Sequence, residues 1–265
     1  MHPMLNIAIR AARQAGDIII RSADSIDVLK ITVKSKNDYT TDVDRRAEEE
    51  IISVLSKAYP EHGYLAEESG SFNDDAEYVW IIDPLDGTAN YMHGFPHYAV
   101  SIALKKGNVI EQAVIYDPVR QDLFTATRGK GASLNNRRLR VSGQRRIDGA
   151  FLGTGFPFKN SKNIEPYLDI FRDIFSSTSG VRRAGAASLD LAYVAAGKLD
   201  GFFEIGLKPW DFAAGLLLIQ EAGGVVTDFF GEHGYFETGN IVCGNPKMHA
   251  ALLDKIESHV LKVIG

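Results

Sequence analysis

Two aspartates, Asp83 and Asp86, stand at the end of an apolar run in the first half of the chain. The run, residues 80–82, is typical of a strand that is buried on both faces of a sheet. Pro84 lies between the two acids, fixes its own φ and favours an extended conformation for Asp83. Carboxylates held together at the end of a strand can bind a cation, so this stretch is the first candidate for chemistry.

The residues that follow could hold an anion. Gly87 permits a tight turn or a close approach of the backbone to a ligand. Thr88 or Asn90 could cap a helix, whose first N–H groups would then point back at the carboxylates. A cation and an anion held side by side are what Mg²⁺-dependent phosphate chemistry requires. The alternative is an ordinary turn after a strand, because Asp, Gly and Pro are common turn formers.

Further acids fall at the ends of other expected elements. Glu67 follows a short strand at 64–66, and Asp211 lies in the first turn of an apolar helix. Asp42 and Asp44 lie at another helix start. Each has a structural alternative, as an N-cap for Asp44 and Asp211 and as a solvated loop residue for Glu67. Together they offer oxygen ligands from separate elements, with no His or Cys beside them, and such a set favours Mg²⁺ over Zn²⁺.

Composition limits the class of protein. The chain has 265 residues, a mass of 29.1 kDa, a formal net charge of −5 and a pI near 5.8. This size allows one large domain or two closely packed halves, and the acidic balance argues against strong direct binding of nucleic acid. A short basic cluster is either a solvated loop or a docking surface for an acidic partner. The cluster consists of Arg137, Arg138, Arg140, Arg145 and Arg146.

The cysteine usage and the first residues predict the compartment. Cys243 is the single cysteine, which excludes an intrachain disulfide, fits a reducing environment and is expected as a small buried hydrophobe. The first twenty residues alternate apolar and charged positions at helical spacing, without a long apolar run or a cleavage site. We therefore expect no signal peptide, no membrane span and a cytoplasmic location.

Periodicity and turn signals predict a mixed α/β chain. The first half, about 1–150, is expected to hold helices at 4–21 and from 40–44 to Pro60, a polar loop at 70–75, and strands at 30–37, 64–66, 80–82, 100–105, 109–116 and 122–127, the last three as an antiparallel meander. The second half, about 151–265, is expected to hold helices at 165–175, 188–196, 211–222 and from 246, and strands at 201–205, 225–227 and 241–243.

Three motifs occur in a fixed order along the chain. They are E-E-S at 67–69, W-I-I-D-P-L-D-G-T-A-N at 80–90, and W-D at 210–211, which small residues and E-A-G-G at 221–224 follow. Together they resemble the inositol monophosphatase family of Mg²⁺-dependent, lithium-sensitive phosphatases. Residues 200–206 and 209–215 look most similar to a bacterial subgroup linked to ribosomal RNA transcription. The resemblance implies one domain over 1–265 with a layered α-β-α-β-α sandwich, of the inositol monophosphatase and fructose-1,6-bisphosphatase type.

The resemblance also implies a set of metal ligands. Glu67, Asp83 and the backbone carbonyl of Leu85 would hold a first Mg²⁺. Asp83, Asp86 and Asp211 would hold a second, with Asp83 bridging the two ions. A third, weaker ion would use Glu67 and waters, which gives two to three ions per subunit.

Catalytic and substrate-binding roles follow from the same resemblance. Thr88, paired with Asp44, would orient or deprotonate the attacking water, and Glu67 would complete the catalytic set. Backbone N–H groups of Gly87 and Thr88 would bind phosphate oxygens. The expected substrate contacts are Leu85, Asp86, Gly87, Thr88, Arg182, Gly185, Ala186, Ala187, Glu204 and Asp211.

Several functions stay open at this point. The leading hypothesis is a phosphomonoesterase acting on inositol 1-phosphate or a similar small polyol phosphate. Rival substrates are fructose 1,6-bisphosphate, 3′-phosphoadenosine 5′-phosphate and histidinol phosphate, although Glu204 favours an uncharged polyol over a second phosphate group. A rival of another class is a protein that docks on the transcription machinery, through the basic cluster or the Arg182–Arg183 pair, with phosphatase activity secondary. A homodimer is implied by the family and weakly supported by the small-residue helix at 188–196.

Overall fold

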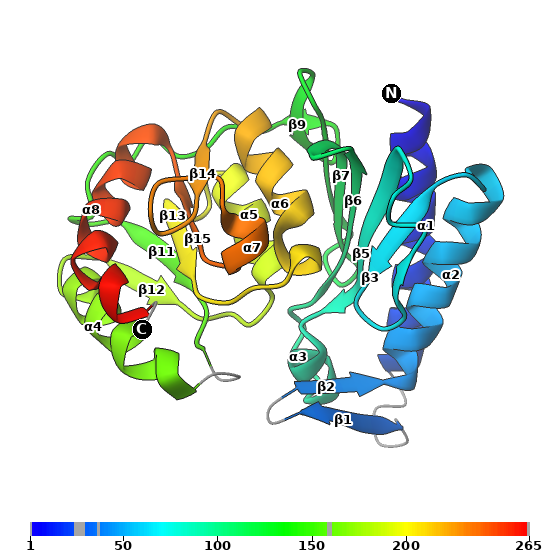
Figure 1. The fold of residues 1–265 in the computed structure, drawn as a ribbon, viewed down its shortest axis with the longest axis horizontal. Helices are drawn as coiled ribbons and strands as arrows, with labels where there is room; N and C mark the ends of the chain where they lie inside the picture. Colours follow the sequence, from blue (N-terminus) through cyan, green and yellow to red (C-terminus); the bar gives the residue numbers. More distant parts are fainter. Residues whose placement is uncertain (1, 24–29, 36–37, 158–160, 264–265) are drawn as a thin grey trace.

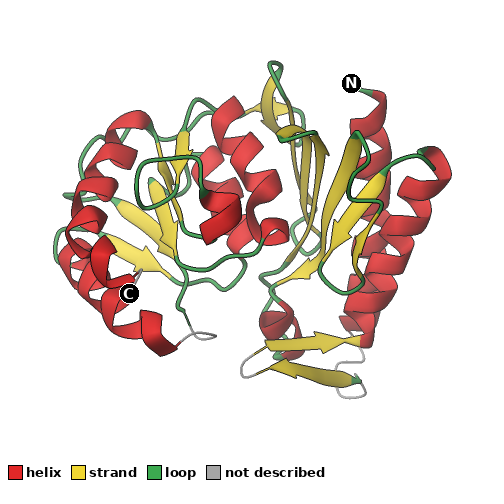
Figure 2. Cartoon of the chain, in the orientation of Figure 1, coloured by secondary structure: helices red, strands yellow, loops and turns green. Residues whose placement is uncertain are grey.

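The computed structural model describes residues 2–23, 30–35, 38–157 and 161–263, whose helices and sheets alternate in layers (Figures 1 and 2). A helical pair, an eight-stranded sheet, a second helical pair, a five-stranded sheet and a third helical pair follow one another. The predicted α-β-α-β-α sandwich is confirmed.

The first layer consists of α1 (Pro3–Ala23) and α2 (Asp42–Ala58), which pack on each other and on the larger sheet. The predicted apolar stripe of α1 is buried, and Ala12 and Ile19 are fully inaccessible. The hydroxyl of Thr41, in an extended conformation, accepts the N–H groups of Val43 and Asp44 and so caps α2. The alternative of Asp44 as the N-cap is therefore wrong, since Asp44 is the third residue of the helix.

The larger sheet has the strand order β10-β9-β8-β7-β6-β5-β3-β4, in which only β3 and β5 pair in parallel. Its strands are β3 (Gly63–Ala66), β4 (Gly70–Phe72), β5 (Tyr78–Asp86), β6 (Ala99–Lys106), β7 (Val109–Asp117), β8 (Asp122–Thr127), β9 (Gly131–Leu134) and β10 (Arg137–Arg138). The predicted meander is confirmed as β6–β8. The predicted loop at 70–75 is wrong in part, because β4 is a three-residue edge strand and such a strand is too short and too exposed to show alternation.

The central helical layer consists of α5 (Ala187–Ala195) and α6 (Pro209–Glu221). The two helices pack closely because a Cβ at Gly215 would lie 2.5 Å from Cβ of Leu191. Both helices are apolar on nearly all sides and are buried between the two sheets. The small residues of α5 thus serve packing within the chain, and the use of this helix as support for a homodimer is wrong.

The second sheet has the order β12-β11-β13-β15-β14, and α4 (Ile164–Phe175) and α8 (Pro246–Val263) pack against each other on its outer side. Its strands are β11 (Phe151–Thr154), β12 (Gly180–Arg182), β13 (Gly201–Glu204), β14 (Val225–Thr227) and β15 (Ile241–Gly244). Cys243 is fully buried in β15, as the sequence predicts. Every strand of this sheet lies beyond position 150.

Short elements complete the described chain. A hairpin of β1 (Ile31–Ser35) and β2 (Asp38–Thr41) replaces the single strand expected at 30–37, whose last two positions lie outside the described residues. The others are α3 (Thr88–Met92), α7 (Tyr235–Thr238) and the 3-10 helix η2 (Ser161–Asn163). Within the described ranges, no helix combines the length and the apolar character that crossing a membrane would need.

Candidate active site

The end of β5 is the centre of the site. Asp83 is only 1% exposed, and one of its carboxylate oxygens accepts the N–H of Leu85 at 3.0 Å. The ladder with β6 is irregular between Asp83 and Asp86, where Pro84 cannot donate a hydrogen bond. Because β3 runs parallel to β5, Glu67 emerges at the same edge, and its N–H donates to Ile82 O at 3.2 Å.

The start of α6 lies beside the same edge, although it is far away in the sequence. Ser101 of β6 pairs with Asp83 in the ladder, and its hydroxyl donates to the carbonyl of Trp210 at 3.3 Å. The next residue is Asp211, whose carboxylate accepts the N–H of Lys208 at 2.6 Å. Asp211 is the third residue of α6, so the alternative of Asp211 as its N-cap is wrong.

The carboxyl groups of these acids influence one another's pKa values. Burial raises the pKa of Asp83 well above its ordinary value, and the charges of Glu67, Asp86 and Asp211 raise it further. Burial also raises the pKa of Glu67 to about 7, against the opposing effect of the Lys34 ammonium group. Burial raises the pKa of Asp86 to about 6, although two hydrogen bonds from Ser188 act to lower it. Four carboxylates, from the turn after β3, from β5 and from the first turn of α6, therefore affect one another electrostatically.

The donor set fits a hard divalent cation. All the predicted ligands offer oxygen atoms, and the ammonium group of Lys34 contacts Glu67 at 3.2 Å. Within the described residues, no three His, Cys, Asp or Glu side chains close around a single point. Instead each of the four carboxylates accepts a hydrogen bond from a neighbouring donor, such as the Ser188 hydroxyl, whose oxygen lies 2.5 Å from an Asp86 carboxylate oxygen. Burial and mutual repulsion disfavour the ionised form of these acids, and a bound cation relieves that condition.

The turn after β5 presents a hydroxyl to a buried acid. The Thr88 hydroxyl oxygen lies 2.8 Å from an Asp44 carboxylate oxygen and 3.1 Å from Leu85 O. Asp44 is inaccessible, and burial raises its pKa. Gly87 precedes α3 with φ +97, and a Cβ there would lie 2.9 Å from His97 O, so the position requires glycine. Gly87 is thus the N-cap of α3, and the expected caps, Thr88 and Asn90, are wrong.

The segment before α5 lies next to this turn. The side-chain amide of Asn90 donates to Ala184 O at 2.9 Å, which holds the segment against α3. Gly185 follows with φ +88, and Ala186 and Ala187 are buried. The structure therefore brings Gly185, Ala186 and Ala187 near the turn that carries Thr88.

Two acids and an arginine line the second-half side of the site. A Cβ at Gly155, the residue after β11, would overlap the carboxylate of Glu204, so this position leaves room for the side chain only as glycine. Asp190 of α5 is 2% exposed, and its pKa is raised by burial and then by Glu204 and Asp86, against Arg183. Glu204 is thereby linked to the carboxylate cluster, and Asp190 is a member that the sequence reasoning missed.

The two arginines at the end of β12 have different surroundings. The Arg182 guanidinium lies over the ring of Phe151 at 4.4 Å, on the outer part of the second sheet. A Cβ at Gly185 would instead lie 2.8 Å from a guanidinium nitrogen of Arg183. Arg183 is therefore the arginine that the structure places beside the 184–187 segment, and the substrate contact of Arg182 stays a prediction.

Comparison with known proteins shows the family of the chain. The model of the inositol monophosphatase family matches residues 1–261. The chain belongs to that family. It is 56% identical over 265 residues to the Nus factor SuhB of Pseudomonas aeruginosa, with 98% of each chain covered. The crystal structure of the extragenic suppressor protein suhB from Bartonella henselae has a TM-score of 0.94 at 43% identity and covers 97% of this chain and 99% of its own. An inositol monophosphate-bound SaIMPase-II has a TM-score of 0.82 at 27% identity and covers 98% and 95%.

Membership of the inositol monophosphatase family has two consequences for this chain. Its activity at the level of the family is that of a phosphatase, and proteins of this family generally depend on Mg²⁺. The SuhB names among its relatives connect the subgroup with transcription, as the sequence resemblance suggests.

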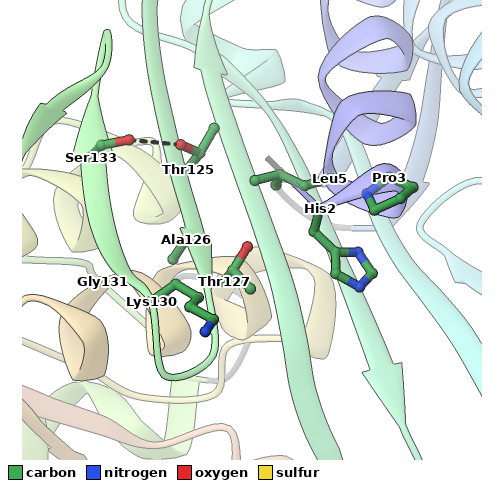
Figure 3. A pocket seen from close by; sticks show the side chains of 9 residues that line it. All are labelled: His2, Pro3, Leu5, Thr125, Ala126, Thr127, Lys130, Gly131 and Ser133. Atoms are coloured by element: carbon green, nitrogen blue, oxygen red, sulfur yellow. Dashed lines mark hydrogen bonds between the residues drawn. The ribbon is translucent and has the colours of Figure 1, made fainter.

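A separate cavity lies at the other end of the fold. It measures about 670 Å³ and lies between the start of α1 and the β8–β9 hairpin, where Thr125 and Ser133 are hydrogen-bonded at 2.9 Å (Figure 3). In Figure 1 the N-terminus and β9 lie at the top, whereas α3, which follows β5, lies at the bottom. The described residues that line the cavity offer hydroxyls and an ammonium group rather than carboxylates, so the cavity is not the phosphatase site.

Proposed function

We propose that this protein is a Mg²⁺-dependent phosphomonoesterase that hydrolyses inositol 1-phosphate or a similar small polyol phosphate. The observation that carries the proposal is the electrostatic interaction of Asp211 with Glu67 and Asp83, and of Asp83 with Asp86. The hydrogen-bonded pair of Thr88 and Asp44 belongs to the turn that follows these two aspartates. Phosphoryl transfer to water needs a positioned nucleophile and neutralisation of the charge on the phosphate oxygens, and these two groups of residues match those needs.

The proposal assigns a role to each predicted ligand. Glu67, Asp83 and the Leu85 carbonyl would hold one ion, and Asp83, Asp86 and Asp211 a second, with a third, weaker ion at Glu67. When bound, such cations neutralise phosphate charge and ease the loss of a proton from water.

The remaining steps fall to groups of the chain. Asp44 accepts a hydrogen bond from the Thr88 hydroxyl, which leaves the Thr88 oxygen free to accept a hydrogen bond from the attacking water. This hydrogen bond would orient the water towards phosphorus. The proton that leaves that water can pass to the Thr88 oxygen while the Thr88 hydroxyl proton passes to the buried Asp44 carboxylate. N–H groups of Gly87 and Thr88 bind phosphate oxygens, because φ +97 at Gly87 turns the backbone at this point.

The second half of the chain supplies the specificity. Glu204 places negative charge on the side where the rest of the substrate would lie. This charge favours hydroxyl groups that donate hydrogen bonds and disfavours a second phosphate group. Gly185, Ala186 and Ala187 add no bulk there, so a compact ring fits, and Arg182 is the expected contact at the rim.

A substrate panel tests the proposal. Phosphate release from inositol 1-phosphate is compared with release from fructose 1,6-bisphosphate, 3′-phosphoadenosine 5′-phosphate and histidinol phosphate, with Mg²⁺, with EDTA and with added Li⁺. We expect preference for the monophosphate of the polyol, loss of activity with EDTA and inhibition by Li⁺.

Asp83→Asn is expected to lose about 10³-fold in turnover, roughly 4 kcal/mol of barrier, whereas the exposed Glu49→Gln keeps it. Preference for a bisphosphate would overturn the substrate, and near wild-type turnover of folded Asp83→Asn would overturn the bridging role.

A second candidate function is docking on the transcription machinery as a Nus factor. The observation that favours it is the 56% identity to the Nus factor SuhB, which covers 98% of both chains. All five arginines of the basic cluster are exposed, so they are available to an acidic partner. A pull-down of transcription proteins by wild type, by Asp83→Asn and by Arg145→Glu/Arg146→Glu separates the two functions. Docking predicts capture by the first two only, and equal capture by all three would remove the basic cluster from this role.

The homodimer and a cytoplasmic location are proposals that rest on the family and on composition. Light scattering at several protein concentrations, with and without Mg²⁺, measures the mass in solution. A constant monomer mass under all these conditions would contradict the homodimer.

A further inference from the structure

The turn that carries Glu67 is held by a buried acid on a neighbouring helix. Residues 67–69 connect β3 to β4, and their N–H groups would ordinarily face solvent in so short a connection. Here the two carboxylate oxygens of Glu48 accept the N–H groups of Glu68 at 2.9 Å and Ser69 at 2.8 Å. Glu48 is 2% exposed, although it belongs to a run of three glutamates in α2.

The same helix also holds the other half of the proposed machinery. Asp44 lies four residues before Glu48, so the two acids lie on one face of α2, about 6 Å apart along its axis. The Thr88 hydroxyl donates a hydrogen bond to Asp44, with 2.8 Å between the two oxygens, while Glu48 holds the turn of Glu67. A single rigid helix therefore connects the turn with the expected metal ligand to the turn with the expected water-orienting hydroxyl.

We propose that Glu48 is a positioning residue that fixes the 67–69 turn, and with it the Glu67 carboxylate, relative to Thr88. The inference rests on the proposed function for its catalytic consequence, but the hydrogen bonds that carry it are independent of that function. A carboxylate that binds two successive N–H groups restricts both the position and the tilt of the turn. Without it, Glu67 would keep its chemical identity and lose its alignment.

The test compares three substitutions on the same helix. Glu48→Gln keeps the shape but turns an NH₂ group towards an N–H donor, and Glu48→Asp keeps the charge but shortens the reach by one methylene. The exposed Glu49→Gln makes the same change of charge as Glu48→Gln on the solvent side and is the matched control. Hydrogen exchange of the peptide that contains residues 67–70 is followed by mass spectrometry in EDTA, and Mg²⁺ binding is measured by calorimetry.

We expect both Glu48 variants to accelerate exchange of this peptide by about tenfold or more, because each loses charge-assisted hydrogen bonds. We also expect both to weaken Mg²⁺ binding by about 10–100-fold, as partners of metal ligands typically do, with turnover at saturating Mg²⁺ less affected. The control should match wild type in both measurements. Should Glu48→Gln fail to fold, Glu48→Asp alone decides.

Two results would overturn the proposal. Unchanged exchange in the folded variants would show that the turn holds itself in place. Wild-type Mg²⁺ affinity in Glu48→Asp would show that Glu48 acts only through its charge. Failure of the proposed function gives a different pattern, since wild type would then release no phosphate while the exchange difference between Glu48 and Glu49 variants remained.

Discussion

The carboxylate cluster predicts that the metal-depleted protein loses stability as the pH rises from about 3.8 to about 7. Burial is the main cause of the raised pKa of Glu67, from 4.5 to about 7, and of Asp86, from 3.8 to about 6. In this window the folded state still binds protons that the unfolded chain has released. The stabilising contribution is therefore complete below the unfolded pKa values and is lost as the pH rises through the folded ones.

The size of the effect follows from the shifts. One pKa unit corresponds to about 1.4 kcal/mol, so the shift of Glu67 alone amounts to roughly 3 kcal/mol. Asp86 contributes a similar amount, but the two are not additive because the charge of Glu67 is itself one of the causes that raise the pKa of Asp86. A loss on the order of 3 kcal/mol is a large part of the 5–15 kcal/mol typical of a folded domain.

Urea denaturation of EDTA-treated protein, at pH values across and on both sides of the window, measures this dependence. The raised pKa of Asp83 keeps this carboxyl protonated in the metal-free folded protein while the unfolded chain ionises it, so Asp83→Asn removes one contribution to the slope and should flatten the curve. Glu49→Gln should follow wild type. Saturating Mg²⁺ should restore stability at the upper pH, because an ion that binds only the folded state stabilises it. The reasoning is refuted by a metal-depleted stability that stays flat or rises across the window, or by a wild-type slope in Asp83→Asn.

Two further substitutions test the turn after β5. Thr88→Val removes the hydroxyl that donates to Asp44 and should lower turnover by about 10²–10⁴-fold. Thr88→Ser keeps the hydroxyl and should retain most of the turnover. Equal rates of phosphate release by the two variants would contradict the role of the hydroxyl. Gly87→Ala must adopt φ +97 with a Cβ 2.9 Å from His97 O and should lower the free energy of unfolding by about 1–3 kcal/mol. Urea denaturation measures that loss, and wild-type stability would show that the backbone can relax.

The parts of the site that local patterns can predict are the acids at the ends of strands. An apolar run that stops at Asp83 marks a strand end, and the parallel pairing of β3 with β5 brings Glu67 to the same edge. The approach of Asp211 depends on packing between distant segments, and only the combination of motifs pointed to it. Its position follows from the contact between Ser101 and Trp210, which no spacing in the sequence encodes.

The acids inside helices were harder to predict. Glu48 stands in a run of three glutamates, and only its helical phase, shared with Asp44, Ile51 and Leu55, separates it from the exposed Glu49. The cap of α2 was ambiguous because Thr41 and Asp44 both carry an oxygen suitable for capping, and a single cap is worth only about 1 kcal/mol.

The packing of the central layer explains how like charges are held together. Glu67, Asp83 and Asp86 come from the first half of the chain, while Asp211 comes from α6, which is buried between the two sheets. The close approach of Gly215 to Leu191 fixes α6 against α5, and the apolar burial of that layer opposes the repulsion among the carboxylates. Hydrophobic packing remote from the site thus maintains an arrangement that electrostatics alone would separate. A bound cation would reverse the sign of the electrostatic contribution, so the same packing that strains the metal-free cluster preorganises it for Mg²⁺.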